Sequence, residues 1–207
     1  MLYFLAIVLL KLPLLLIKRP KVYGKKENLK IKDGVIFICN HQNLLDPLLI
    51  AILTPRIIRF MAKSELFESK IGRWFFRGLF VFPVNRNSAD IKSVRRAISI
   101  LNEGKAFGIF PEGRRSVTDE MDDFEKGPAF IAAKSKAPVV PMYISPATYK
   151  PFGRLKVIIG DVIRAEDIER HCEKRMVVES MTNEMQNSMN ELSFELRRLE
   201  RKQPRKR

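Results

Sequence analysis

Short apolar runs alternate with amphipathic segments along most of this 207-residue chain. Helical spacing of apolar residues predicts helices over 48–53, from Ser88 to about Leu101, over 124–134, and from about 165 onward. The apolar runs that we interpret as strands span 35–39, 57–61, 81–84, 106–110, 138–144 and 155–159. This alternation predicts an α/β fold, built as a single domain with a mixed, largely parallel sheet that is flanked by helices, the last of them C-terminal.

Two further segments are less regular. The stretch 21–32 is basic and is followed by the turn signal Asp33-Gly34, which predicts a short strand or hairpin. The stretch 71–80 combines bulky, aromatic and basic residues. It suits either a surface that meets lipid or ordinary core packing, because aromatic residues are common in both.

The first seventeen residues are almost wholly apolar, interrupted by Lys11 and Pro13 and followed at once by two basic residues. The run is slightly short for a membrane span, and it lacks the basic start and the cleavage site of a secretory peptide. We therefore predict that residues 1–20 form an uncleaved membrane-associating helix that lies in one leaflet, with Lys11 reaching the surface. A helix packed on the protein's own core and a complete single span are the alternatives.

Lysine and arginine outnumber aspartate and glutamate by 38 to 23, which gives a net charge of +15. Such a charge favours an anionic partner: nucleic acid, phospholipid head groups or a phosphorylated substrate. No nucleic-acid motif is present, and the aromatic residues lie in apolar runs instead of alternating with basic ones. We expect an anionic membrane surface as the partner, although a non-enzymatic basic protein that binds membrane or nucleic acid is a distant alternative.

The same features predict a location on the cytoplasmic face of the cell membrane. Two cysteines, Cys39 and Cys172, make no disulfide framework, which favours a reducing compartment. The basic tail 201–207 either contacts anionic lipid or is simply solvated.

One of the chain's two histidines, His41, follows the predicted strand 35–39 and stands five residues before Asp46. Loops between a strand and a helix are common places for chemistry on open α/β sheets. A neutral imidazole can take a proton from an alcohol when a carboxylate fixes its tautomer. The pair therefore predicts a general base and its orienting acid. Asp46 followed by Pro47 is also typical of a helix start, with Asp46 as the N-cap.

Two other loops carry charged residues directly after predicted strands. Arg86 follows the strand 81–84, and the sequence FPEGRRS follows the next strand at 110–116. Pro111 and Gly113 make the second loop a tight turn, and planar guanidinium groups suit phosphate. The three loops could therefore meet over one pocket that holds a base, a carboxylate at Glu112 and several arginines.

These residues belong to four blocks that resemble the glycerolipid acyltransferase superfamily, in particular its bacterial membrane-bound 1-acylglycerol-3-phosphate acyltransferases. The blocks are NHQNLLDP at 40–47, GLFVFPVNR at 78–86, FPEGRRS at 110–116 and APVVPMYI at 137–144. Where the family usually has threonine, this chain has Arg114, which either adds a phosphate contact or points to solvent. We align Arg115 with the family's arginine.

The resemblance implies that residues 21–200 form an acyltransferase domain. The reaction it implies is acyl transfer from acyl-ACP (acyl carrier protein) or acyl-CoA to the sn-2 hydroxyl of lysophosphatidic acid, giving phosphatidic acid without an acyl-enzyme. His41 would be the base and Asp46 would orient it. The other implied roles are phosphate binding by Arg86 and Arg115, positioning of the glycerol by Glu112 and Gly113, and shaping of the acceptor pocket by Pro141.

Several alternatives stay open. The acceptor could be glycerol-3-phosphate, another lysophospholipid or an amino-lipid. Cys39 could carry the acyl group as a thioester, because positions 39 and 41 would share a strand face if the strand continued that far. We expect no metal and no resident cofactor, since His171, the only other histidine, has no metal-ligand spacing around it. The absence of a G-x-S-x-G motif agrees with direct transfer.

Overall fold

The protein is described by a computed structural model that covers residues 2–85, 90–116, 118, 120–151 and 153–202. Within these residues, seven strands form one sheet in the order β1-β7-β6-β2-β5-β3-β4. Neighbouring strands run parallel except for β6 and β7, which are antiparallel. The strands are Lys21–Gly24 (β1), Val35–Cys39 (β2), Ile58–Lys63 (β3), Val81–Val84 (β4), Ala106–Ile109 (β5), Val139–Ile144 (β6) and Lys156–Ile159 (β7). The predicted α/β fold with a mixed, largely parallel sheet is confirmed.

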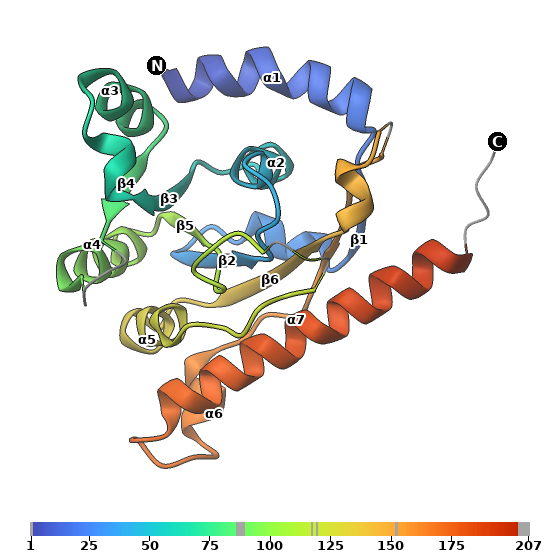
Figure 1. Ribbon diagram of the computed structural model, residues 1–207. Helices are drawn as coiled ribbons and strands as arrows, with labels where there is room; N and C mark the ends of the chain where they lie inside the picture. The colour runs from blue at the N-terminus through green and yellow to red at the C-terminus, as the bar shows by residue number, and fades with distance from the viewer. Residues whose placement is uncertain (1, 86–89, 117, 119, 152, 203–207) are drawn as a thin grey trace.

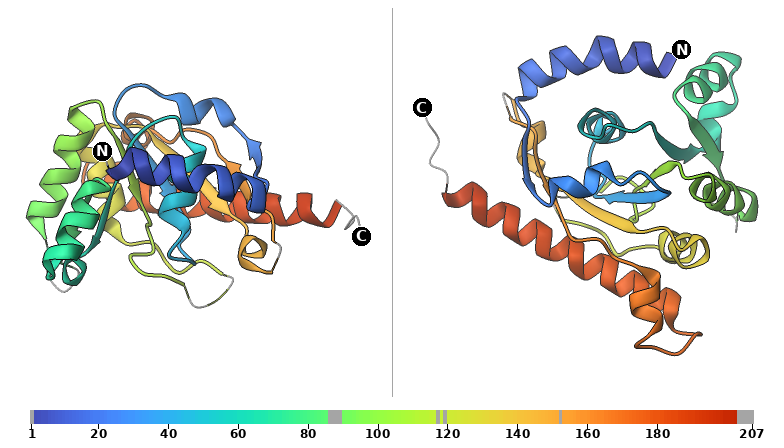
Figure 2. Two further views of the ribbon diagram at one scale, coloured as in Figure 1. Left: turned by 90° about the horizontal axis from the view of Figure 1, so that it is seen from above. Right: turned by 180° about the vertical axis from the view of Figure 1, so that it is seen from behind.

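Helices cover both faces of this sheet (Figure 1). In the described residues the α-helices are Leu2–Lys18 (α1), Asp46–Leu53 (α2), Lys70–Gly78 (α3), Ile91–Asn102 (α4), Lys126–Ser135 (α5), Ala165–Glu169 (α6) and Val177–Lys202 (α7). Short 3-10 segments are Lys26–Lys30 (η1), Ser64–Phe67 (η2) and Pro146–Tyr149 (η3). One face carries α4, α5 and the long α7, and the other carries α2, with α1 beyond it (Figures 1 and 2).

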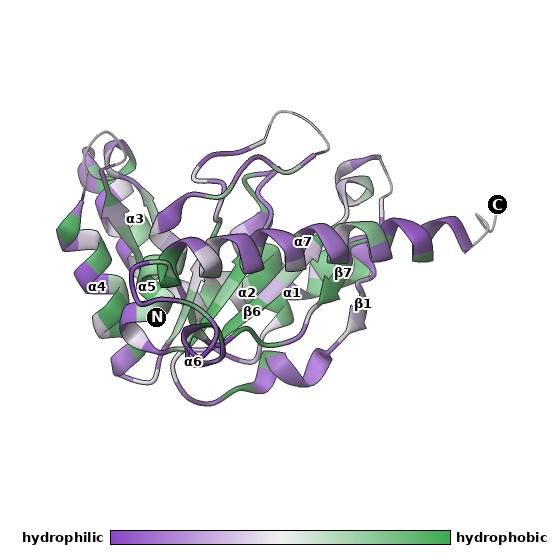
Figure 3. Cartoon of the chain, turned by 90° about the horizontal axis from the view of Figure 1, so that it is seen from below, coloured by the Kyte–Doolittle hydropathy of each residue, from purple (hydrophilic) through white to green (hydrophobic). Residues whose placement is uncertain are grey.

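The central strand β2 is buried on both faces, as expected for a parallel strand between two helical layers. Ile36 and Ile38 pack in the cluster that includes α4, α5 and α7, whereas Phe37 and Cys39 pack with α2. Viewed from below, α7 lies across hydrophobic strands (Figure 3). Its inner face is made of Met181, Met185, Met189, Leu192 and Leu196.

This topology places the candidate loops on one edge of the sheet. Strands β2, β5 and β6 are mutually parallel, with Ile38 beside both Ile109 and Pro141. The segments that follow Cys39, Ile109 and Ile144 therefore all leave from the same edge. Loops at the carboxyl ends of parallel strands are where α/β folds place their sites.

The N-terminal helix α1 lies outside the two main layers and rests on α2 and α3. Its Tyr3 ring packs edge-on against Phe80, with 5.5 Å between centroids. At the other end, Lys18 donates a hydrogen bond from Nζ to the carbonyl of Thr148 (2.8 Å), in η3. Among the residues that the structure describes, no helix is long and apolar enough to cross a membrane, so a complete span is not found.

One prediction of local structure is wrong. Helix α4 begins at Ile91 rather than at Ser88, which lies outside the described residues; the Asp90 carboxylate caps it by accepting from the Ser93 N–H (3.0 Å). Of the strand or hairpin predicted at 21–32, the structure has the short strand: β1 pairs with the distant strand β7, and the chain then turns into η1.

No residue of the segment 71–80 is fully buried, although two of its rings pack on buried neighbours. It forms most of α3 and then leads into β4, and no side chain of α3 is buried. Phe76 packs against Phe67, with 5.4 Å between ring centroids, whereas Ile71, Trp74 and Phe75 are exposed. Contact of this segment with lipid stays a prediction.

Candidate active site

His41 and Asp46 form the centre of the candidate site. His41 Nδ1 lies 2.9 Å from Asp46 Oδ2, and the side chains are 13% and 1% exposed respectively. A carboxylate can only accept a hydrogen bond, so the neutral imidazole donates Nδ1–H to Asp46. Nε2 is then left with its lone pair free to accept a proton from a substrate. The geometry is that of an oriented general base.

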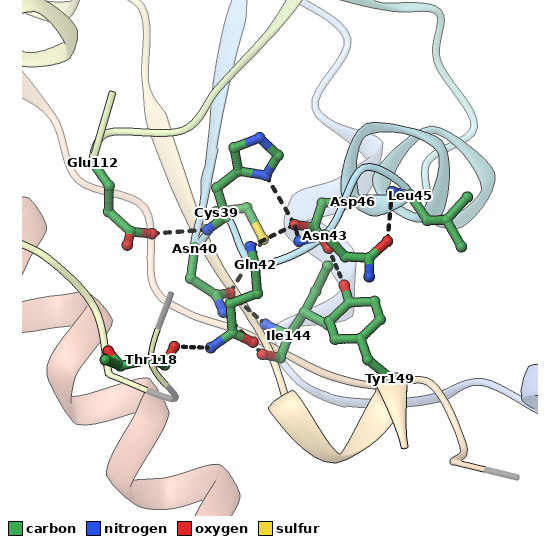
Figure 4. Close-up of polar contacts among 11 residues, drawn as sticks. Cys39, Asn40, Gln42, Asn43, Leu45, Asp46, Glu112, Thr118, Ile144 and Tyr149 are labelled. Atoms are coloured by element: carbon green, nitrogen blue, oxygen red, sulfur yellow. Dashed lines mark hydrogen bonds and ion pairs between the residues drawn. The ribbon is translucent and has the colours of Figure 1, made fainter. Parts of the chain in front are cut away.

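The Asp46 carboxylate is saturated with donors (Figure 4). Besides His41, Oδ2 accepts from the backbone N–H groups of Gln42 (2.8 Å) and Asn43 (2.7 Å). Oδ1 accepts from the hydroxyl of Tyr149. A buried carboxylate needs such donors to stay ionised.

The N-cap interpretation of Asp46 is wrong. Asp46 is itself the first residue of α2, with Leu45 at the N-cap position. The Asp46 carboxylate points back to the amides of the preceding loop instead of forward to the free amides of the helix. It therefore fixes the conformation of the loop that carries His41.

Tyr149 is a site residue that sequence reasoning missed. It ends η3, 103 residues from Asp46, and it carries no local signal because the contact depends on how the chain folds. Burial, together with the nearby charge of Asp46 and the hydrogen bond to it, raises the pKa of Tyr149 far above the ordinary range. The hydroxyl is therefore a permanent donor to Asp46.

Glu112 joins the two motif loops. Its buried carboxylate accepts from the His41 N–H through Oε1 (2.8 Å) and from the Asp122 N–H through Oε2 (3.1 Å). The Ser116 N–H in turn donates to the His41 carbonyl (2.8 Å). Burial raises the pKa of Glu112, which the two amides partly offset. Both carboxylate oxygens thus accept hydrogen bonds from backbone N–H groups. A contact of Glu112 with the glycerol stays a prediction.

Gly113 allows this loop to turn tightly. Its φ of +69° lies in the left-handed region, and its N–H donates to the Phe110 carbonyl (3.1 Å). A Cβ at this position would stand 3.1 Å from Glu125 Cγ. The turn therefore favours glycine on both conformational and steric grounds.

The predicted phosphate ligands are placed unequally. Arg114 is mostly exposed and forms an ion pair with Asp122 (Nε to Oδ2, 3.0 Å), so it is engaged at the surface. Arg115 is also exposed, on the loop that is hydrogen-bonded to His41. Arg86 lies outside the described residues, so its role stays a prediction.

Pro141 is not brought close to His41. It lies inside β6, on the face covered by α7, where its Cγ is near Gly160. Asn40, which follows β2, is buried and bonds to both backbone groups of Ile144, the last residue of β6 (2.8 and 3.0 Å). Any influence of Pro141 on an acceptor pocket would have to pass through β6, and that role stays a prediction.

Two more residues shape the surroundings of the histidine. The Phe110 ring stacks on the His41 ring with 4.0 Å between centroids, and Phe60 stacks behind Phe110 at 6.0 Å. Cys39 is completely buried, and burial raises the pKa of its thiol well above the ordinary value, with Asp46 and Glu112 adding to the rise. A buried neutral thiol is a poor nucleophile, which argues against the acyl-thiol alternative.

His171 lies far from this centre in the fold. It follows α6, is exposed, and has Nδ1 2.8 Å from the Asp167 carbonyl. Within the described residues, no group of three or more histidine, cysteine, aspartate or glutamate side chains is arranged to hold a metal ion.

The chain is similar to known proteins over most of its length. Residues 19–145 match the family model described as Acyltransferase. The 1-acyl-sn-glycerol-3-phosphate acyltransferase of Bacillus subtilis is 34% identical over 184 residues, which cover 86% of this chain and 90% of that protein. The protein of the same name from Streptococcus pneumoniae is 28% identical, over 79% of this chain and 62% of its own length.

A solved structure gives the same fold. The crystal structure of the 1-acyl-sn-glycerophosphate acyltransferase PlsC from Thermotoga maritima matches with a TM-score of 0.63. The match covers 84% of this chain and 73% of that chain, at 24% sequence identity.

Replacing Glu112 with glutamine should loosen the junction between the loops. The amide keeps one acceptor oxygen, so one of the two N–H groups now faces an NH₂ group and loses its partner. We expect the free energy of unfolding to fall by about 1–3 kcal/mol. Amide hydrogen exchange at His41 and Asp122 should become faster, as measured by mass spectrometry.

Glu125→Gln is the matched control, because Glu125 is an exposed carboxylate in the same loop. Its effect on stability should stay within about 0.5 kcal/mol. Equal effects of the two variants would contradict the role of Glu112 in joining the two loops.

Proposed function

This chain belongs to the acyltransferase family and is an acyltransferase, and we propose that it acylates the sn-2 hydroxyl of lysophosphatidic acid to give phosphatidic acid. The acyl donor is a thioester, either acyl-ACP or acyl-CoA. The observation that carries the proposal is the His41–Asp46 pair: Nδ1 of a 13% exposed imidazole lies 2.9 Å from Oδ2 of a buried carboxylate. The relatives from Bacillus and Streptococcus are named as 1-acyl-sn-glycerol-3-phosphate acyltransferases, which supports this acceptor.

The reaction needs a base but no covalent enzyme intermediate. Nε2 of His41 takes the proton of the acceptor hydroxyl as that oxygen attacks the thioester carbonyl carbon. The tetrahedral intermediate then collapses, the C–S bond breaks, and the imidazolium returns the proton to the leaving sulfur. Asp46 stabilises the imidazolium between these two steps, as a carboxylate does for a histidine base.

The acceptor's phosphate requires positive charge close to the base. Arg115 fits this need because it is exposed, and its loop is bonded to His41 through Glu112 and Ser116. We assign Arg86 to the same phosphate, because it follows β4, whose carboxyl end lies at the same edge of the sheet as that of β5. Arg114 is paired with Asp122 and is assigned no contact.

Docking on a membrane would give the enzyme access to a lipid acceptor. The outer surface of α1 carries the exposed apolar residues Leu5, Val8, Leu9, Leu12, Leu16 and Ile17. The adjoining helix α3 exposes Ile71, Trp74 and Phe75, with Lys70, Arg73 and Arg77 among them. Apolar side chains flanked by basic ones suit the interface of an anionic membrane. We assign these two helices to the cytoplasmic leaflet of the cell membrane.

His41→Ala should abolish acyl transfer, because it removes the group that is assigned to take the hydroxyl proton. We expect a loss of at least about 1,000-fold, in line with the removal of a catalytic general base. The measurement is transfer of a labelled acyl group from one thioester to a panel of acceptors: lysophosphatidic acid, glycerol-3-phosphate, another lysophospholipid and an amino-lipid.

The control is His171→Ala, which removes the other histidine of the chain and should leave the rate unchanged. Turnover by His41→Ala close to that of the wild type would sink the assignment of the base. A clear preference of the wild type for another acceptor would replace lysophosphatidic acid in the proposal.

Arg115→Ala should weaken acceptor binding more than it slows turnover. Losing one charged contact to phosphate is worth roughly 1.5–3 kcal/mol, so we expect KM for the acceptor to rise about 10- to 100-fold. Arg114→Ala serves as the control and should change KM little. Steady-state kinetics at varied acceptor concentration check this, and an unchanged acceptor dependence in Arg115→Ala would remove Arg115 from the phosphate site.

Trp74 provides a direct reporter of membrane docking, because it is the chain's single tryptophan and is 67% exposed. Mixing the protein with vesicles of phosphatidylglycerol and phosphatidylcholine should shift its fluorescence to shorter wavelength, and brominated lipids should quench it. The control is a Trp74→Phe, Phe194→Trp double variant, which moves the tryptophan to an exposed position on α7. If the protein floats with the vesicles while Trp74 emission stays unchanged, α3 is not part of the docking surface.

A further inference from the structure

Among the residues that the structure describes, the hydroxyl of Tyr149 is the one donor to Asp46 that comes from outside the motif loop. The other three donors are His41 itself and the two amides that follow it, at Gln42 and Asn43. Those three bind Oδ2, whereas Tyr149 binds Oδ1 (Figure 4). One carboxylate oxygen therefore serves the local loop, and the other is held by a residue that arrives from η3, beyond β6.

We propose that Tyr149 is a positioning residue that sets the basicity of His41 by holding Oδ1 of Asp46. The inference rests on the proposed function only for its meaning in catalysis, because the contact itself is independent of the substrate. Tyr149 acts on the base through Asp46 and touches no reacting atom.

The physical reason lies in how a carboxylate shares its negative charge. A hydrogen bond to one oxygen stabilises the ionised carboxylate and draws charge density away from the other oxygen. The more charge is held at Oδ1, the less remains at Oδ2 to stabilise an imidazolium at His41. Tyr149 therefore lowers the proton affinity of His41, which keeps more of the histidine in the neutral form that acts as a base.

The other ionisable groups facing this pair do not compete for the same position. Glu112 approaches from the loop after β5 and uses both oxygens on backbone amides, including that of His41. Cys39 lies at the end of β2 and is a neutral buried thiol. Only Tyr149 presents a side-chain donor to Oδ1 among the contacts of the described residues.

Tyr149→Phe removes this donor and keeps the ring. We expect the pKa of His41 to rise by roughly half a pH unit, the effect of removing one of several hydrogen bonds to its partner carboxylate. The pKa is measured by NMR on protein with ¹⁵N-labelled histidine in detergent micelles. Because the chain has two histidines, His171 is an internal reference in the same spectrum, and its pKa should not move.

The kinetic counterpart uses the acyl-transfer assay. The acid limb of the pH profile of kcat/KM for Tyr149→Phe should move to higher pH by the same amount. At pH values well below the pKa of His41, kcat/KM should therefore be about 3-fold lower than in the wild type. The rate on the alkaline plateau and KM for the acceptor should stay close to the wild-type values. A structural defect would instead lower the rate at every pH.

Tyr143→Phe is the matched control. Tyr143 is buried in β6 on the face that packs with α7, so its loss of a hydroxyl should leave the pKa of His41 unchanged. Uniform incorporation of 3-fluorotyrosine gives an independent probe of opposite sign: the more acidic hydroxyl is a stronger donor, so the pKa of His41 should fall.

An unchanged pKa of His41 in Tyr149→Phe, or in the fluorotyrosine protein, would overturn the inference. The NMR titration needs no substrate, so it decides the role of Tyr149 even if the wild type acylates none of the acceptors. That second result would refute the proposed function instead.

Discussion

The burial of one ionised carboxylate governs the organisation of this site. Asp46 is almost completely removed from water, and an isolated charge there would be strongly unfavourable. Its oxygens are satisfied by His41, by two amides of the intervening loop and by Tyr149. Each partner is thereby fixed in place, so the hydrogen bonds that offset the burial of the charge also hold the imidazole in one orientation.

A second carboxylate does the same for the neighbouring loop. Glu112 is buried between His41 and Asp122 and bonds to the backbone of both. Through it the strand-to-helix loop after β2 and the loop after β5 become one unit, although 71 residues separate the bonded groups in sequence. Arg114 and Arg115 lie on the second loop, so the backbone that carries them is held at a fixed position relative to His41. The short sequence blocks are informative because they mark the parts of this unit.

The sequence was sufficient for features that depend on local pattern. Strands β2 and β4 have the predicted bounds, since continuous apolar runs between turn signals are characteristic of buried strands. The start of α4 was missed because the cap is Asp90 rather than Ser88, two residues that are equally suitable by type. Contacts made across the fold could not be predicted in this way. Tyr149 reaches Asp46, and β1 pairs with β7, only because the whole sheet brings them together.

The hydrogen bond from Lys18 to the Thr148 carbonyl gives α1 a structural role, in addition to the apolar surface that this helix exposes. It fastens the end of that helix to η3, one residue before the tyrosine that holds Asp46. The Leu155 N–H also donates to the Lys18 carbonyl (2.7 Å), so the junction is bonded on both sides. A shortened version of the protein, trimmed at its N-terminus for ease of purification, would therefore lack part of the scaffold behind the His41–Asp46 pair.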